Sequence, residues 1–138
     1  MPSERAVVLE WKGEGLKFDG RGSIPTSPGI TVDGDSETGP SPMQALLLSA
    51  ASCAASDVVL ILEKMRVGLK RFSVTVTGMR RDVDPRKYIS IHFAFQLAGS
   101  GLDEAKAERA VALSVEKYCS VIHSLAPDIA ISHDIAVA

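Results

Sequence analysis

Two cysteines are the residues of this chain best suited to chemistry. Cys53 lies in the middle of a long apolar segment, and Cys119 follows 66 positions later (119 minus 53). A thiolate can attack the O–O bond of a peroxide to give a sulfenic acid, and a second thiol can then condense with it as a disulfide. The attacking thiol needs a positive charge, a helix N-terminus or hydrogen-bond donors nearby. Simple packing of both thiols stays an open alternative, because free cysteine is often buried.

The other chemistry-bearing side chains are scattered. The three histidines show no HxxxH spacing and the cysteines no CxxC spacing, so the sequence predicts no metal site. His123 falls one helical turn after Cys119 and is a weak candidate for a chemical role, whereas His92 and His133 are interpreted as residues on strand surfaces. No phosphate loop leads from a strand into a helix, so no cofactor is expected.

Length and charge exclude several classes of protein. The 138 residues predict one domain, residues 1–138. A formal net charge of -2 gives no broad basic field, so a nucleic-acid partner is not expected. The first residues carry charges and no apolar signal segment, which indicates a cytoplasmic protein.

The cysteine-bearing segment, residues 39–66, is predicted to be a central helix. Pro42 suits a first helical turn and Ser41 can cap it, while Glu63, Lys64 and Arg66 return the chain to water. Between these ends only Gln44 and Asp57 are strongly polar. Such a helix should be wrapped by sheet, by another helix or by a second subunit. Its apolar run is a little short for a membrane span, and no membrane partner is expected.

The segments around this helix predict an α+β protein with antiparallel sheets. Three short strands near residues 5–11, 16–18 and 30–32 form an N-terminal meander, with residues 19–22 as a turn. Period-two alternation over residues 72–77 and 89–97 predicts an antiparallel hairpin. An amphipathic helical segment from Asp103 onward carries its apolar stripe on Leu102, Ala105, Ala110, Leu113 and Val115. Residues 129–137 form a last strand.

Two motifs resemble those of a known family. Pro42-Met43-Gln44 with LLLSAASC, and later EKYCSV ending at Val121, are similar to the two cysteine motifs of the OsmC/Ohr family of hydroperoxide-related proteins. Within that family the likeness is to the YhfA-like branch. The order of predicted elements also matches, and the resemblance covers essentially the whole chain.

The resemblance implies an OsmC-like fold in which a buried central helix lies at the heart of an intertwined homodimer. It also implies that Cys53 is the peroxidatic thiol and Cys119 the resolving thiol. Cys119 would then lie near the start of a short helix, with Tyr118 at the break, and the helix dipole could help to ionise it.

Two departures from the family pattern concern the groups that assist the thiolate. Members of the Ohr type have a glutamate directly after the helix-entry proline, where this chain has Met43. They also use an arginine from the N-terminal strands. Here Lys12, Lys17 and Arg21 lie in that region without a clear match.

The leading hypothesis is a cytoplasmic homodimer that uses Cys53 and Cys119 to reduce a small apolar organic hydroperoxide, with a dithiol as reductant. The alternative is a non-enzymatic protein of the same fold that binds a small apolar ligand, which Met43 favours. A third reading, an interaction module, rests only on the charged hairpin tip at residues 80–87.

Overall fold

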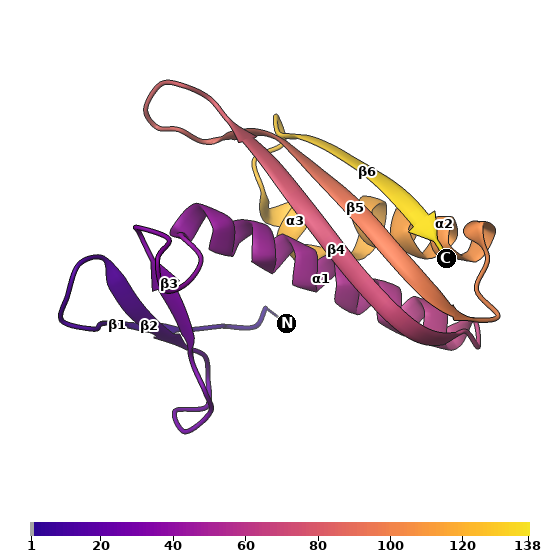
Figure 1. Cartoon of the computed structure of the whole chain (residues 1–138), viewed down its shortest axis with the longest axis horizontal. Helices are drawn as coiled ribbons and strands as arrows, with labels where there is room; N and C mark the ends of the chain where they lie inside the picture. The colour runs from indigo at the N-terminus through magenta and orange to yellow at the C-terminus, as the bar shows by residue number, and fades with distance from the viewer. Residues whose placement is uncertain (1) are drawn as a thin grey trace. The chain divides into compact units, whose positions relative to one another are not determined.

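The protein is described here from a computed structural model that covers residues 2–138. Its contacts divide it into two compact units, the first ending at Leu46 and the second running from Leu47 to Ala138. Figure 1 shows the elements of both. Each unit is considered separately.

The first unit holds the predicted antiparallel meander. Its strands are β1 (Val8–Trp11), β2 (Lys17–Arg21) and β3 (Ile30–Asp33), with β2 in the centre. The prediction that residues 19–22 form a turn is wrong for most of that stretch. Gly20 pairs with Leu9 on one side and Ile30 on the other, so backbone hydrogen bonding to two neighbours extends β2 through the glycine.

A buried aspartate organises the loop after β3. Asp33 accepts hydrogen bonds from the backbone N–H groups of Asp35, Glu37 and Thr38, and from the Thr38 hydroxyl. The Thr38 and Asp35 amides outweigh the cost of burial and hold the pKa of Asp33 at about 2. The loop that leads to the central helix is therefore folded around one carboxylate.

The central helix α1 (Pro42–Lys64) begins and ends with recognisable caps. At its start the Gln44 N–H donates to the Ser41 hydroxyl over 3.2 Å, and the Ser41 N–H donates to Gln44 Oε1 over 2.9 Å. This reciprocal pair is a capping box, with Pro42 at the first helical position. The predicted capping role of Ser41 is confirmed.

The end of α1 is a Schellman motif. Arg66 takes the left-handed conformation with φ 63°, its N–H donates to the Glu63 carbonyl, and the Val67 N–H donates to the Leu62 carbonyl. Leu62 and Val67 are both buried, which supplies the apolar contact that accompanies this motif.

The second unit is built on a three-stranded sheet of β4 (Gly68–Arg80), β5 (Tyr88–Ser100) and β6 (Ala130–Val137). The predicted antiparallel hairpin of β4 and β5 is confirmed, with both strands longer than the alternating pattern indicated. β6 pairs with β5 in parallel. A parallel neighbour requires a crossover connection, which the helical segment between the two strands provides.

That helical segment is broken into three pieces. It consists of α2 (Glu104–Leu113), the π-helical turn η1 (Ser114–Tyr118) and α3 (Ser120–Ser124). Asp103 caps α2 by accepting a hydrogen bond from the Lys106 N–H. Cys119 has extended backbone angles and separates η1 from α3, as the family resemblance implies. The buried α2 residues are Ala107, Ala110 and Val111, so the predicted stripe is confirmed at Ala110 and wrong at the exposed Ala105.

The core of this unit lies between the sheet and the helices, which occupy the same side of the sheet in Figure 1. The inward face of β5 contributes Ile91, Phe93, Phe95 and Leu97, and α1 contributes a stripe at intervals of four residues, Ala50, Ala54, Val58 and Leu62. The chain fully covers this stripe of α1 and leaves several apolar side chains of the helix exposed. Leu48 and Leu60 are each 57 % exposed and Val59 is 42 % exposed.

By length and composition, α1 could span a membrane. It has 23 residues, and its most apolar 18-residue window has a mean hydropathy of 2.1. The expectation that its apolar run is too short for a span is therefore not supported by its length. A core helix of a soluble protein meets the same criteria.

Candidate active site

Cys119 is held at the point where the helical segment breaks. Its side chain is fully buried, and its sulfur accepts a hydrogen bond of 3.5 Å from the Ile122 N–H at the start of α3. Its own N–H donates to the Ser114 carbonyl over 2.8 Å, which closes the π-helical turn. The backbone on both sides of Cys119 thus fixes where its sulfur lies.

Cys53 lies in the middle of α1 and is partly exposed, and both cysteines are free thiols. Within one chain the Cys53 side chain lies close enough to Cys119 to raise the pKa of the Cys119 thiol. The structure therefore brings together two residues that the sequence separates by an entire hairpin and a helix.

The two thiols have different environments. Burial is the main cause that raises the pKa of Cys119 to about 11, and the hydrogen bond to Cys53 and the charge of its thiolate add to the effect. A hydrogen bond that raises a thiol pKa is one in which the protonated S–H donates. Cys119 is thus a neutral S–H group at physiological pH.

The expected help of the α3 N-terminus in ionising Cys119 is present but too small to lower its pKa below the ordinary value. The Ile122 and Val121 amides at the start of α3 do lower its pKa. Their effect is smaller than the cost of removing the thiolate from water. A helix of five residues supplies only a small part of a full helix dipole.

The other residues considered from the sequence do not join the thiols. The side chains of His123 and Glu116 are exposed. His92 lies on the outer sheet face, as predicted, with Nδ1 2.7 Å from the Ser132 hydroxyl and Nε2 3.2 Å from Asp134. His133 was wrongly interpreted as a surface residue, since alternation along β6 turns it toward the helices.

The environment of His133 shows why the interpretation failed. Its ring meets that of Phe95 edge-on, with centroids 6.4 Å apart, and Nε2 lies 3.3 Å from the Glu108 carboxylate on α2. Because α2 supplies an acidic partner, a histidine can lie on the inward face of β6. Its residue type alone therefore does not show which face of the strand it occupies.

Groups that could replace the missing glutamate and arginine have other partners in the first unit. Gln44, beside Met43, is committed to the capping box. Arg21 binds Asp19 at 2.9 Å and also donates to two loop carbonyls. Lys17 lies 3.9 Å from Glu37. Among residues 2–138 no lysine or arginine donates a hydrogen bond to either sulfur.

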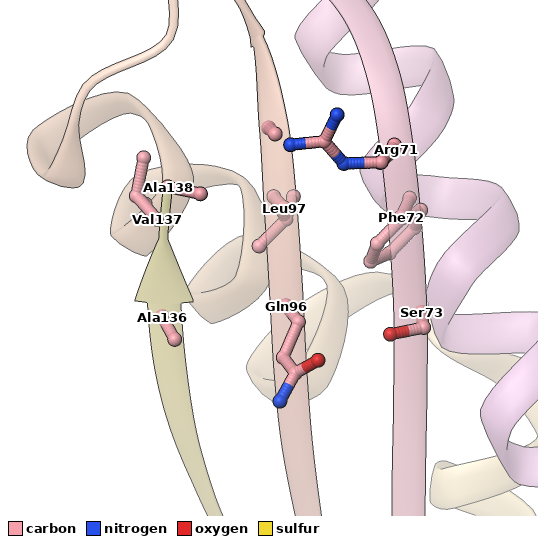
Figure 2. Close-up of a pocket in the computed structure, with 9 residues that line it drawn as sticks. Arg71, Phe72, Ser73, Gln96, Leu97, Ala136, Val137 and Ala138 are labelled. Carbon is pink, nitrogen blue, oxygen red and sulfur yellow. The ribbon is translucent and has the colours of Figure 1, made fainter.

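Two hollows lie away from the cysteines. The larger, of about 600 Å³, lies at one end of the three-stranded sheet, where Arg71 extends from β4 toward β5 near Leu97, and Gln96 lies level with Ser73 (Figure 2). The smaller, of about 350 Å³, is an apolar groove on the first unit. Neither is lined by Cys53 or Cys119.

Sequence reasoning noted Asp57 in the central helix but missed Ser114, the residue that binds it. The buried Ser114 hydroxyl donates to the Asp57 carboxylate over 2.9 Å and lies 3.2 Å from the Ala54 carbonyl. Asp57 can be recognised from the sequence because it is an isolated acid in an apolar helix. Ser114 cannot be recognised in this way, because nothing in the local pattern predicts a π-helical turn.

Comparison with known proteins identifies the family. The family model described as OsmC-like protein matches residues 33–134. Protein YhfA of Escherichia coli strain K12 is 40 % identical over 125 residues, which is 90 % of this chain and 92 % of that protein.

Solved structures agree on the fold. The OsmC-like protein of Mycoplasma pneumoniae superposes with a TM-score of 0.82 at 15 % identity and covers 100 % of this chain and 99 % of its own. The organic hydroperoxide resistance protein OhrB of Bacillus subtilis gives 0.61 at 13 % identity, covering 96 % and 98 %. With the family model and a 40 % identical relative spanning most of its length, this chain belongs to the OsmC-like protein family.

Proposed function

We propose that this protein is a two-cysteine thiol peroxidase that reduces organic hydroperoxides. The observation that carries the proposal is that two free thiols, Cys53 and Cys119, lie close enough within one chain for Cys53 to raise the pKa of Cys119. The organic hydroperoxide resistance protein of Bacillus subtilis, which shares the fold, supports this choice of chemistry.

The reaction has two steps. The Cys53 thiolate attacks the distal peroxide oxygen, and the O–O bond breaks to give a Cys53 sulfenic acid and, after protonation, an alcohol. The Cys119 sulfur then attacks the oxidised sulfur, which forms a disulfide and releases water. An external dithiol reduces the disulfide and is itself oxidised.

The different environments of the thiols assign their roles. Cys53 is partly exposed, so a peroxide can reach it. Cys119 is buried and its pKa is raised to about 11, which suits a thiol that stays protonated until a sulfenic acid forms beside it. We therefore assign the attack to Cys53 and the resolution to Cys119.

We further propose that the active form is a homodimer in the cytoplasm. Leu48, Val59 and Leu60 on α1 are exposed apolar side chains, and the meander of the first unit exposes Leu9 and Ile30. A second subunit that covers these side chains would remove a large apolar area from water. It would also supply the apolar walls for a small hydroperoxide, with α1 in the dimer interior rather than in a membrane.

A non-enzymatic role in binding an apolar ligand is the second candidate. Two observations favour it: Met43 stands in place of the glutamate, and the acid Asp57 lies one helical turn from Cys53. A nearby carboxylate disfavours a thiolate. In that case Cys53 and Cys119 would remain reduced in the presence of a hydroperoxide.

The decisive experiment is to treat the reduced protein with one equivalent of cumene hydroperoxide and to map its thiols by mass spectrometry. Peroxidase chemistry predicts the loss of two hydrogens and a Cys53–Cys119 crosslink. In the Cys53→Ser variant peroxide consumption should stop, while Cys119→Ser should still form a sulfenic acid that dimedone traps. Unreacted wild-type thiols would overturn the proposal in favour of the ligand-binding role.

A further inference from the structure

The Ser114 side chain links the two segments that carry the cysteines. Ser114 is fully buried, and its hydroxyl donates to Asp57 Oδ2 of α1 over 2.9 Å. The same hydroxyl lies 3.2 Å from the Ala54 carbonyl. Ala54 directly follows Cys53, and Asp57 lies one helical turn beyond it. The acceptors of Ser114 are thus in the part of α1 that carries Cys53.

The main chain of Ser114 is tied to the other cysteine. Its carbonyl accepts the Cys119 N–H over 2.8 Å, the hydrogen bond that closes η1. The Ser114 N–H is shared between the Ala110 and Val111 carbonyls of α2. Ser114 therefore connects α2, the Cys119 backbone and α1 through three different groups of one residue.

This arrangement has a consequence for sulfur chemistry. Disulfide formation requires Cα atoms about 4.4–6.8 Å apart and a restricted dihedral angle, so small displacements of one cysteine matter. A π-helical turn has an extra residue compared with an α-helical turn and needs outside contacts to persist. The charge-assisted hydrogen bond to Asp57 is such a contact, and it lies where the turn meets α1.

We infer that Ser114 and Asp57 are positioning residues that hold Cys119 against Cys53 for disulfide formation. The inference rests on the proposed peroxidase function and concerns its second step. In that step the Cys119 thiol and the Cys53 sulfenic acid form an S–S bond and release water, with no further oxidant. Neither Ser114 nor Asp57 touches the peroxide.

The variants Ser114→Ala and Asp57→Ala test this role. Ser114→Ala should leave the rate of Cys53 oxidation by cumene hydroperoxide within about twofold of wild type, while in both variants disulfide formation slows by about 10- to 100-fold, the cost of a small misplacement of reacting groups. In Asp57→Ala the disulfide step is timed from the sulfenic acid onward, because loss of the carboxylate also favours the Cys53 thiolate and speeds its oxidation. The variant Asp57→Asn keeps an acceptor oxygen and should recover most of the rate. The double variant should be no slower than either single variant, because both changes break the same contact.

Ser56→Ala is the matched control. Ser56 is an exposed serine of α1, close to Cys53 in sequence, and its hydroxyl donates to the Ser52 carbonyl of the same helix. The change should alter neither step. Rapid mixing with hydroperoxide, a dimedone quench and mass spectrometry would separate sulfenic acid from disulfide at each time. An unchanged rate of disulfide formation in Ser114→Ala would overturn the inference.

A second measurement needs no peroxide. The protein is equilibrated with mixtures of reduced and oxidised glutathione, and the ratio at which half of it carries the Cys53–Cys119 disulfide is measured. That ratio gives the effective concentration of Cys119 at Cys53. That concentration should fall about 10-fold or more in Ser114→Ala and remain unchanged in Ser56→Ala. If the wild-type thiols do not react with hydroperoxide, the peroxidase proposal fails. The glutathione measurement still tests whether Ser114 positions Cys119. Equal values for Ser114→Ala and wild type would reject it.

Discussion

At the scale of single residues, the protonation of Cys119 sets the order of events in the proposed reaction. Burial and the neighbouring Cys53 raise the pKa of Cys119, against the pull of two helix amides. A resolving thiol that stays protonated avoids direct reaction with peroxide and keeps an S–H directed at its partner. The division of labour thus depends on where each cysteine lies rather than on cysteine chemistry alone.

This protonation state can be measured by the ¹³Cβ chemical shifts of labelled cysteines as a function of pH. Cys119 should titrate at about 11, and Cys53→Ala should lower that pKa without bringing it down to 9.0, because burial is the largest cause. Since the folded pKa lies above 9.0, the thiol's contribution to stability is complete below pH 9 and is lost as the pH rises toward 11. A wild-type titration at 9.0 or below would contradict the assignment.

At the scale of elements, α1 is defined by its two ends. The capping box of Ser41 and Gln44 starts it, and the Schellman motif at Arg66 stops it and turns the chain into β4. Arg66 is a residue with a side chain in a left-handed conformation that favours glycine. The helix end is therefore well hydrogen bonded, but the backbone of Arg66 is strained.

The variant Arg66→Gly should relieve this strain. A left-handed conformation costs an L-residue about 1–2 kcal/mol, part of which is offset by the greater unfolded-state entropy of glycine, so the free energy of unfolding should rise by about 0.5–1 kcal/mol. Urea unfolding at fixed protein concentration would measure it. Arg66→Ala, which keeps the strain and removes the charge, is the control. An equal gain in both variants would show that charge, not backbone conformation, is responsible.

At the scale of the whole molecule, the exposed apolar surface is the feature that one chain does not account for. α1 buries one stripe inside the chain and leaves Leu48, Val59 and Leu60 open to water. The apolar groove of about 350 Å³ on the first unit is a second such surface. Surfaces of this kind are typical of an interface between subunits.

The variant Leu60→Glu should weaken the proposed homodimer. Burying one leucine side chain is worth about 1.5–3 kcal/mol, and burying an unpaired carboxylate costs more, so the dissociation constant should rise at least about tenfold. Light scattering over a dilution series would report the mass. Thr75→Glu, which places the same charge on the exposed outer face of β4, should leave it unchanged. A wild-type monomer at all concentrations would refute the dimer.

The features that the sequence by itself determined are local ones. Ser41 three residues before Gln44 specifies a helix start, and alternation from Phe72 and from Ile89 specifies two strands of a hairpin. The position of Cys119 at a helix break followed from its family motif, which the family assignment supports. These predictions are correct because each depends on hydrogen bonds or side-chain periodicity within a few residues.

Only the tertiary structure decided which residues meet. The contact of Cys53 with Cys119, the parallel pairing of β6 and the inward orientation of His133 join residues far apart in the chain. The raised pKa of Cys119 follows from burial, which overcame the helix amides that local reasoning emphasised. Burial and long-range hydrogen bonds depend on how elements pack, and no short stretch of sequence encodes them alone.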